Sequence, residues 1–95
     1  MTKIKAIDNK SLLFLMFNFS GMELRSASDR LKNDKDVVLE AVRLDGNALC
    51  YASERLQDNE EIVNTSLLSS NFESFRYASQ RLQKKFEIKM GIRGI

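Results

Sequence analysis

The sequence predicts an all-α fold in which short antiparallel helix pairs stack into a small α-solenoid-like repeat of about six or seven helices. The first reason is composition: the 95-residue chain has no proline and four glycines, while helix-forming residues are plentiful. The second is a pentapeptide that recurs as ASDRL at 27–31, ASERL at 52–56 and ASQRL at 78–82, at offsets of 25 and 26 residues. This period is typical of repeat proteins in which one unit cannot bury its apolar face alone.

We expect one domain made of three units and the beginning of a fourth. The first unit covers residues 8–32, the second 33–57 and the third 58–83, and residues 84–95 form a partial fourth unit. In each unit a polar start signal and an apolar stripe precede a turn and the pentapeptide. We therefore expect two short helices in each unit.

The first helix of each unit is predicted to begin at an Asx residue, Asp8, Asn33 or Asp58. The side-chain oxygen of such a residue can accept a hydrogen bond from an otherwise unpaired helical N–H. Apolar residues follow in pairs four positions apart, a spacing that keeps them on one buried helical face. In the three units they are Leu12, Leu13, Met16 and Phe17; Val37, Val38, Ala41 and Val42; and Ile62, Val63, Ser66 and Leu67.

The turn after each first helix is predicted from residues that tolerate a left-handed backbone. Gly21 and Gly46 are expected to end the first two of these helices in that conformation, and Asn71 to take the same role in the third unit. The pentapeptide then lies on the second helix, where its small Ala faces a neighbouring helix and its Leu fills the core.

The segment from Leu31 to Ile62 resembles the tandem helical repeats catalogued as domain of unknown function family 4116. The family pattern is an L-x-x-D-x-x-x-V-x-x-A-V run, a turn, and an A-L-x-Y-A-S run. It falls on Leu31, Asp34, Val38, Ala41, Val42, Gly46, Ala48, Leu49, Tyr51, Ala52 and Ser53. The resemblance extends more loosely to both ends. It implies a helical repeat and brings no catalytic residues to carry over.

The first helix provides our preferred partner-binding surface. Its run LLFLMFNF at 12–19 has seven apolar residues in eight, so apolar side chains surround the helix, whereas a terminal repeat should have a polar outer face. We expect Leu15 and Phe19 to be exposed and to bind another protein or a second copy of the chain. The alternative is that residues 1–7 or the C-terminal GIRGI fold over them.

The three pentapeptide arginines, Arg30, Arg55 and Arg81, are a second candidate surface. One guanidinium per unit could grip phosphate groups or an acidic partner. The alternative is structural: an arginine near a helix C-terminus interacts favourably with the helix dipole and can pair with a carboxylate of the next unit.

Charge is uneven along the chain and suggests an alternative function. Residues 29–61 carry a net charge of −4, whereas residues 76–95 carry +5. The basic end could bind nucleic acid or an anionic membrane electrostatically, although it lacks a platform of aromatic residues for stacking bases.

Other function classes have few residues to draw on. The chain has no histidine, the commonest general base and metal ligand, and its only cysteine is Cys50. We expect no catalytic residues, cofactor or metal site. The apolar run is too short to span a membrane and no signal peptide is evident, so we expect a cytoplasmic location. The favoured function is a non-enzymatic protein-interaction module, with self-association as one form of it.

Overall fold

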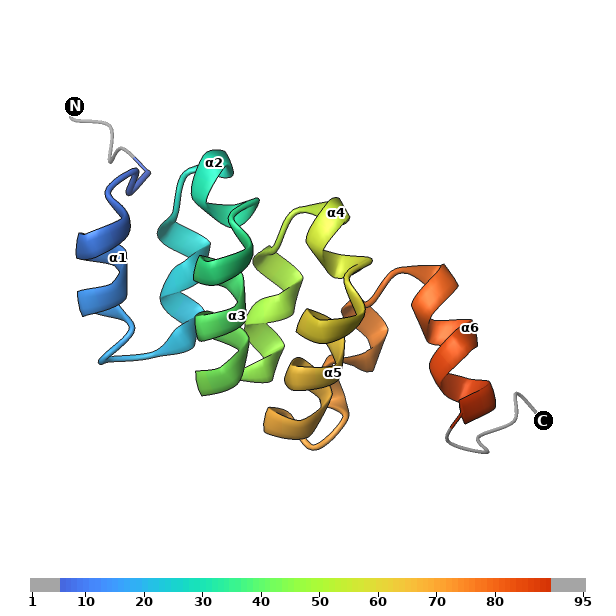
Figure 1. Ribbon diagram of the computed structural model, residues 1–95. Coiled ribbons are helices and arrows are strands. Elements are labelled where there is room, and N and C mark those ends of the chain that lie inside the picture. The colour runs from blue at the N-terminus through green and yellow to red at the C-terminus, as the bar shows by residue number, and fades with distance from the viewer. Residues whose placement is uncertain (1–5, 90–95) are drawn as a thin grey trace, which may run out of the picture.

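The computed structural model describes residues 6–89, and this part of the chain is built from helices (Figure 1). Six α-helices and three short 3₁₀ helices follow one another within it. They are α1 (Lys10–Met16), η1 (Gly21–Ser26), α2 (Asp29–Lys32), α3 (Lys35–Leu44), η2 (Gly46–Tyr51), α4 (Glu54–Gln57), α5 (Glu60–Ser69), η3 (Glu73–Tyr77) and α6 (Gln80–Lys89). The all-α prediction is confirmed.

The helices form two layers along an elongated molecule of 51 × 23 × 21 Å. The helices α1, α3 and α5, here called the first-layer helices, follow one another along the molecule, and η1, η2 and η3 form the second layer behind them (Figure 1). Helix α3 packs against both η1 and η2, and α5 packs against α3 and η2. Each later first-layer helix therefore contacts the 3₁₀ helix of the unit before its own.

The predicted apolar stripe forms the core. Val37, Val38 and their equivalents on α5, Ile62 and Val63, are fully buried. In the first unit Leu13 is fully buried, but Leu12, which corresponds to Val37, is exposed. The stripe prediction is therefore wrong for Leu12, because nothing in the described part of the chain covers that side of α1, and Met16 is only partly buried.

The first-layer helices begin one residue later than predicted. Their N-caps are Asn9, Asp34 and Asn59, and the side chain of each accepts a hydrogen bond from a backbone N–H of the first turn. Each N-cap directly follows the Asx residue that the sequence predicted for this role. The chain thus carries two adjacent Asx residues at every break, and the second of them caps the helix.

The fourth break does not occur in the described part of the chain. At the equivalent position stand Lys84 and Lys85, and lysine has no acceptor oxygen with which to cap a helix. Helix α6 therefore runs without interruption from Gln80 to Lys89. Of the predicted fourth unit, residues 90–95 lie outside the described residues.

Gly21 and Gly46 are required by close packing rather than by backbone conformation. Neither has the left-handed backbone that the sequence predicted, and both are buried at the start of their 3₁₀ helices. A Cβ atom on Gly21 would collide with the carbonyl oxygen of Ala41, and one on Gly46 with that of Ser66. Glycine at these positions lets the backbone of the next first-layer helix approach η1 and η2.

The third unit turns differently. Asn71 has a φ of 53°, so the left-handed prediction is confirmed there, and Phe72 follows with a φ of 72°. Counted back from the ends of η2 and η3, Phe72 occupies the place of Gly46. Since no first-layer helix of the described chain packs on this position, a large side chain fits and remains half-exposed.

The pentapeptides are junctions between helices, so the prediction of one helix running through each of them is wrong. Ala27, Ala52 and Ala78 end the 3₁₀ helices in an extended conformation. The serine that follows accepts a hydrogen bond from the backbone N–H of the pentapeptide leucine and so begins the next α-helix. The leucines are fully buried, as predicted.

Candidate functional site

Each pentapeptide arginine binds the Asx residue at the start of its own unit. Arg30 donates from Nε to Oδ1 of Asp8 at 3.0 Å and from Nη2 to the Asp8 carbonyl oxygen at 2.8 Å. Arg55 makes the same two contacts with Asn33, and Arg81 makes them with Asp58. The arginine thereby ties the short helix after the junction to the residue ahead of the first-layer helix.

The pentapeptide serine completes this arrangement. The hydroxyl groups of Ser28, Ser53 and Ser79 donate to the same Asx Oδ1 atoms, at 2.6, 2.7 and 2.5 Å. We call the set of serine, arginine and Asx residue the clamp. The sequence-based alternative placed the arginine's partner in the next unit, and this was wrong because the partner lies in the same unit.

The clamps lower the pKa values of the two carboxyl groups that they contain, those of Asp8 and Asp58. The Ser28 hydroxyl, and then Arg30, hold the pKa of Asp8 below its ordinary value. Ser79 and Arg81 lower the pKa of Asp58 in the same way. Arg55 faces a neutral amide instead, so its charge is not balanced within its clamp.

The clamps give the repeated arginines a role in folding. The side chains of Arg30 and Arg81 are still 64% and 56% exposed, but their Nε and Nη2 donors are occupied. Binding of a partner by Arg30, Arg55 and Arg81 remains a prediction.

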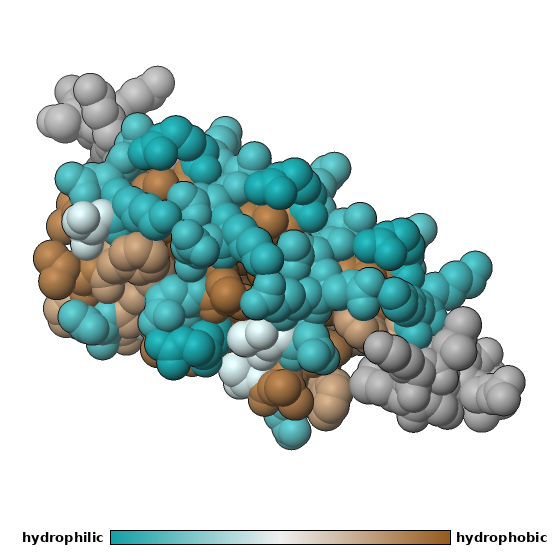
Figure 2. Space-filling view, viewed as in Figure 1, coloured by the Kyte–Doolittle hydropathy of each residue, from teal (hydrophilic) through white to brown (hydrophobic). Residues whose placement is uncertain are grey.

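Three large apolar side chains are exposed at the N-terminal end of the molecule. Leu12 and Leu15 on α1 are 47% and 64% exposed, and Phe19, in the turn that follows, is 85% exposed. We call them the α1 face, and Figure 2 shows hydrophobic surface gathered over this end. The residues that correspond to Leu15 are Glu40 on α3 and Thr65 on α5, so an apolar side chain at this position is specific to the first unit.

The chain segments that could cover the α1 face are only partly described. The backbone of Ile7 makes two hydrogen bonds with the junction that follows η1. The Ile7 N–H donates to the Ser26 carbonyl oxygen, and the Ile7 carbonyl oxygen accepts from the Ser28 N–H, each at 2.7 Å. It leaves Leu15 and Phe19 exposed. The rest of that predicted cover, residues 1–5, and the C-terminal GIRGI lie outside the described residues.

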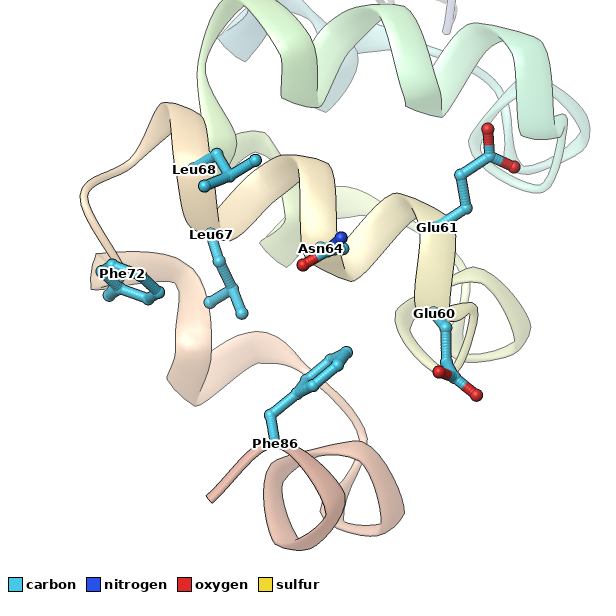
Figure 3. A pocket seen from close by; sticks show the side chains of 7 residues that line it. All are labelled: Glu60, Glu61, Asn64, Leu67, Leu68, Phe72 and Phe86. Atoms are coloured by element: carbon cyan, nitrogen blue, oxygen red, sulfur yellow. The ribbon is translucent and has the colours of Figure 1, made fainter. Parts of the chain in front are cut away.

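A second apolar surface lies at the other end of the molecule, as an open groove of about 600 Å³ between α5 and α6. Leu67, Leu68 and Phe72 are among the residues that line it, and Phe86 from α6 lies across from Leu67 (Figure 3). Leu68 is 74% and Phe72 49% exposed. We call this the groove. The sequence analysis did not predict the groove. Lys84 and Lys85, which stand where a fourth Asx pair is expected, could have indicated that no further first-layer helix begins there.

Acidic residues stand at the start of α5, on the border of the groove. Glu60 forms an ion pair with Lys85 at 2.7 Å, and Glu61 forms one with Lys35 at 2.7 Å. These pairs join α5 to its neighbours on both sides. They also leave the border of the groove close to electrical neutrality.

The basic C-terminal region is partly engaged in internal contacts. Arg81 and Lys85 form ion pairs with Asp58 and Glu60, and the guanidinium of Arg76 lies 5.0 Å from the centre of the Tyr77 ring. Residues 90–95 of this region lie outside the described residues. The described charges therefore contribute less to an external partner than the sequence total suggests.

Two kinds of reactive site, a metal site and an activated thiol, can be checked among the described residues. No group of three or more potential metal ligands occurs among them. Burial raises the pKa of Cys50, which keeps it in the less reactive thiol form. No helix in the described part of the chain is long and apolar enough to span a membrane.

Comparison with known proteins adds one finding. The model of a family described as "Domain of unknown function (DUF4116)" matches residues 9–57 and, in a second overlapping match, residues 36–83. No curated protein and no solved structure matches the chain.

Proposed function

The chain belongs to the DUF4116 family of domains of unknown function, and from this premise we propose that it is a non-enzymatic helical-repeat module of the α-solenoid type. Its function is to bind another protein, and the α1 face is the binding surface. Catalysis is not part of the proposal, because the carboxyl groups of Asp8 and Asp58, whose pKa values are lowered, serve the clamps.

The exposure of the α1 face is the observation that carries this proposal. Leu12, Leu15 and Phe19 are large apolar side chains that the described part of the chain leaves exposed at one end of the molecule. Removing a leucine or phenylalanine side chain from water is worth about 1.5–3 kcal/mol. A partner that covers all three gains several kilocalories per mole before the costs of association.

Site-specific photo-cross-linking tests the proposal. Benzoylphenylalanine in place of Phe19 should cross-link the full-length chain to a defined partner in extracts of the source cells, and the same probe in place of Gln80 should not. Gln80 is a suitable control position because it is exposed and lies on α6, at the end of the molecule away from α1 (Figure 1).

A charge placed on the α1 face should abolish the cross-link. Leu15→Glu introduces the residue that α3 already carries at this position, so the helix should tolerate it. The control variant is Gln80→Glu, which adds the same charge where the other pentapeptides have Asp29 and Glu54. An unchanged cross-link in Leu15→Glu would refute the α1 face as the binding surface.

The electrostatic alternative, binding of nucleic acid or an anionic membrane through residues 76–95, has less support. Two of its described charges, Arg81 and Lys85, are balanced by Asp58 and Glu60. Contacts with phosphate groups weaken steeply with added salt. A partner held by the α1 face should instead stay bound at high salt.

A further inference from the structure

The two ends of the molecule both carry exposed apolar side chains: the α1 face lies at one end, and the groove lies at the other (Figures 2 and 3). We propose that copies of the chain associate head to tail, with the α1 face of one copy seated in the groove of the next. This inference rests on the proposed function, because it names a second copy of the chain as the partner of the α1 face.

The chain already makes this kind of interface twice within itself. Helix α3 packs against η1 where Gly21 approaches Ala41, and α5 packs against η2 where Gly46 approaches Ser66. A third equivalent position exists on α5 and η3. No first-layer helix occupies this position in the described chain. The reason is that α6 continues as one helix through Lys84 and Lys85, where the earlier units end one helix and begin the next first-layer helix. The groove is this open position.

Among the described first-layer helices, α1 is the one that does not pack on the 3₁₀ helix of a preceding unit. Val37 on α3 and Ile62 on α5 are fully buried, whereas Leu12 at the same position of α1 is about half exposed. Seating α1 in the groove of another copy would place Leu12 in the environment that Val37 and Ile62 already have. The same chain therefore provides both an unoccupied packing position, the groove, and a helix of the type that packs at such positions, α1.

The charges near the two surfaces do not oppose the contact. Lys10 is the only charged residue of α1, and it already pairs with Asp34 at 3.2 Å. At the groove, Glu60 and Glu61 are paired with lysines. The contact is therefore mainly between apolar side chains, and its strength should depend little on salt.

The intermolecular contact differs from the internal ones in one respect. Phe72 stands where the internal interfaces have glycine, and Met16 stands where they have Ala41 or Ser66. Two large side chains keep the backbones apart, so the helices meet through side chains only. This predicts a weaker and reversible association. Because the interface is heterologous, it extends into open stacks rather than closed dimers.

Two single substitutions and their mixture test the head-to-tail arrangement. Leu12→Glu places a charge at the position of the buried Val37 and Ile62, so it damages the α1 face and keeps the groove. Phe72→Glu places a charge at the position of Gly46, so it damages the groove and keeps the α1 face. In sedimentation velocity the wild-type chain should form dimers and longer species as its concentration rises, and each variant alone should be monomeric. An equimolar mixture should form one-to-one dimers that grow no further, because it contains one intact copy of each surface.

The other outcomes overturn the proposal. If Phe72→Glu still dimerises alone and Leu12→Glu does not, the α1 faces pair with each other about a two-fold axis. If the wild-type chain stays monomeric up to about 1 mM, no useful self-association exists. A monomer that still cross-links through position 19 to a different protein would overturn this inference and keep the proposed function. Unchanged circular dichroism spectra, and a repeat of the mixture with Phe19→Glu in place of Leu12→Glu, guard against misfolded variants.

Discussion

Arg55 donates to Asn33 through Nε at 2.9 Å and through Nη2 at 2.8 Å, in the geometry that Arg30 and Arg81 adopt with aspartates. The clamp is therefore held by hydrogen-bond geometry, and a negative charge is not required for it. This equivalence makes Asn33 a natural place to measure what the charge adds.

Asn33→Asp should stabilise the protein slightly. The substitution gives Arg55 the carboxylate that the other two clamps have, and exposed ion pairs typically contribute about 0.2–1 kcal/mol. Urea unfolding at pH 7 should show a higher midpoint that falls back when salt is added. A midpoint equal to or below that of the wild-type chain would show that the charge adds nothing.

The clamps should make the free energy of unfolding depend on pH below about pH 5. The folded-state pKa values of Asp8 and Asp58 lie below the ordinary value of 3.8. Their stabilising effect is therefore complete at neutral pH. As the pH falls through 3.8 the unfolded chain takes up protons first, so stability is lost until the folded-state pKa values are passed.

The double variant Asp8→Asn/Asp58→Asn provides the control for this pH dependence. Asn33 already shows that an amide can serve in a clamp, so the variant should fold and lose stability less steeply between pH 5 and pH 3. Some pH dependence should persist through Asp34: although burial opposes it, hydrogen bonds from the Val37 N–H and Lys10 lower its pKa. Identical curves for variant and wild type would contradict the prediction.

Gly46→Ala should destabilise the protein by about 1–3 kcal/mol, the usual cost of forcing extra volume into a packed site. The added Cβ would meet the Ser66 carbonyl and lie 2.7 Å from Cβ of Ser70. Phe72→Gly is the matched control, since it restores glycine at the equivalent position with its left-handed φ of 72°. Thermal unfolding should show a lower midpoint for Gly46→Ala and little change for Phe72→Gly. Equal effects would mean that close packing does not explain the glycine.

The repeat could be predicted from the sequence because its signals are local. The pentapeptide period, the apolar pairs such as Val37 and Val38, and the absence of proline all act within one or two helical turns. These signals were enough for the all-α fold and for most of the buried face. They were also enough to place Leu15 and Phe19 among the exposed residues.

Contacts between distant residues could not be read in the same way. Asp8 and Asn9 are equally able to cap a helix, and the choice between them depends on Arg30, more than 20 residues away. Gly21 resembles a turn glycine until its contact with the Ala41 carbonyl is known. The groove depends on α6 remaining a single helix, which is a consequence of two lysines where an Asx pair was expected.

Lys84→Asp/Lys85→Asn should introduce a break into α6. The variant restores the Asx pair found at Asp58 and Asn59, and the second residue can then cap a new helix. Backbone chemical shifts should become non-helical at positions 84 and 85. The control Lys84→Ala/Lys85→Ala removes the same charges and the ion pair of Lys85 with Glu60, but it should leave the helix continuous. A continuous helix in the Asx variant would show that the lysines do not decide where α6 ends.

Leu13 and Leu15 should differ sharply in their effect on folding, although they are two positions apart on α1. Leu13 is fully buried, so Leu13→Ala leaves a cavity and should cost about 2–5 kcal/mol. Leu15 is mostly exposed, so Leu15→Ala should change the free energy of unfolding by no more than about 0.5 kcal/mol. Urea unfolding of dilute samples measures both, because dilution removes any contribution from association. If Leu15→Ala were as costly as Leu13→Ala, Leu15 would belong to the core and the α1 face would lose its central residue as a binding surface.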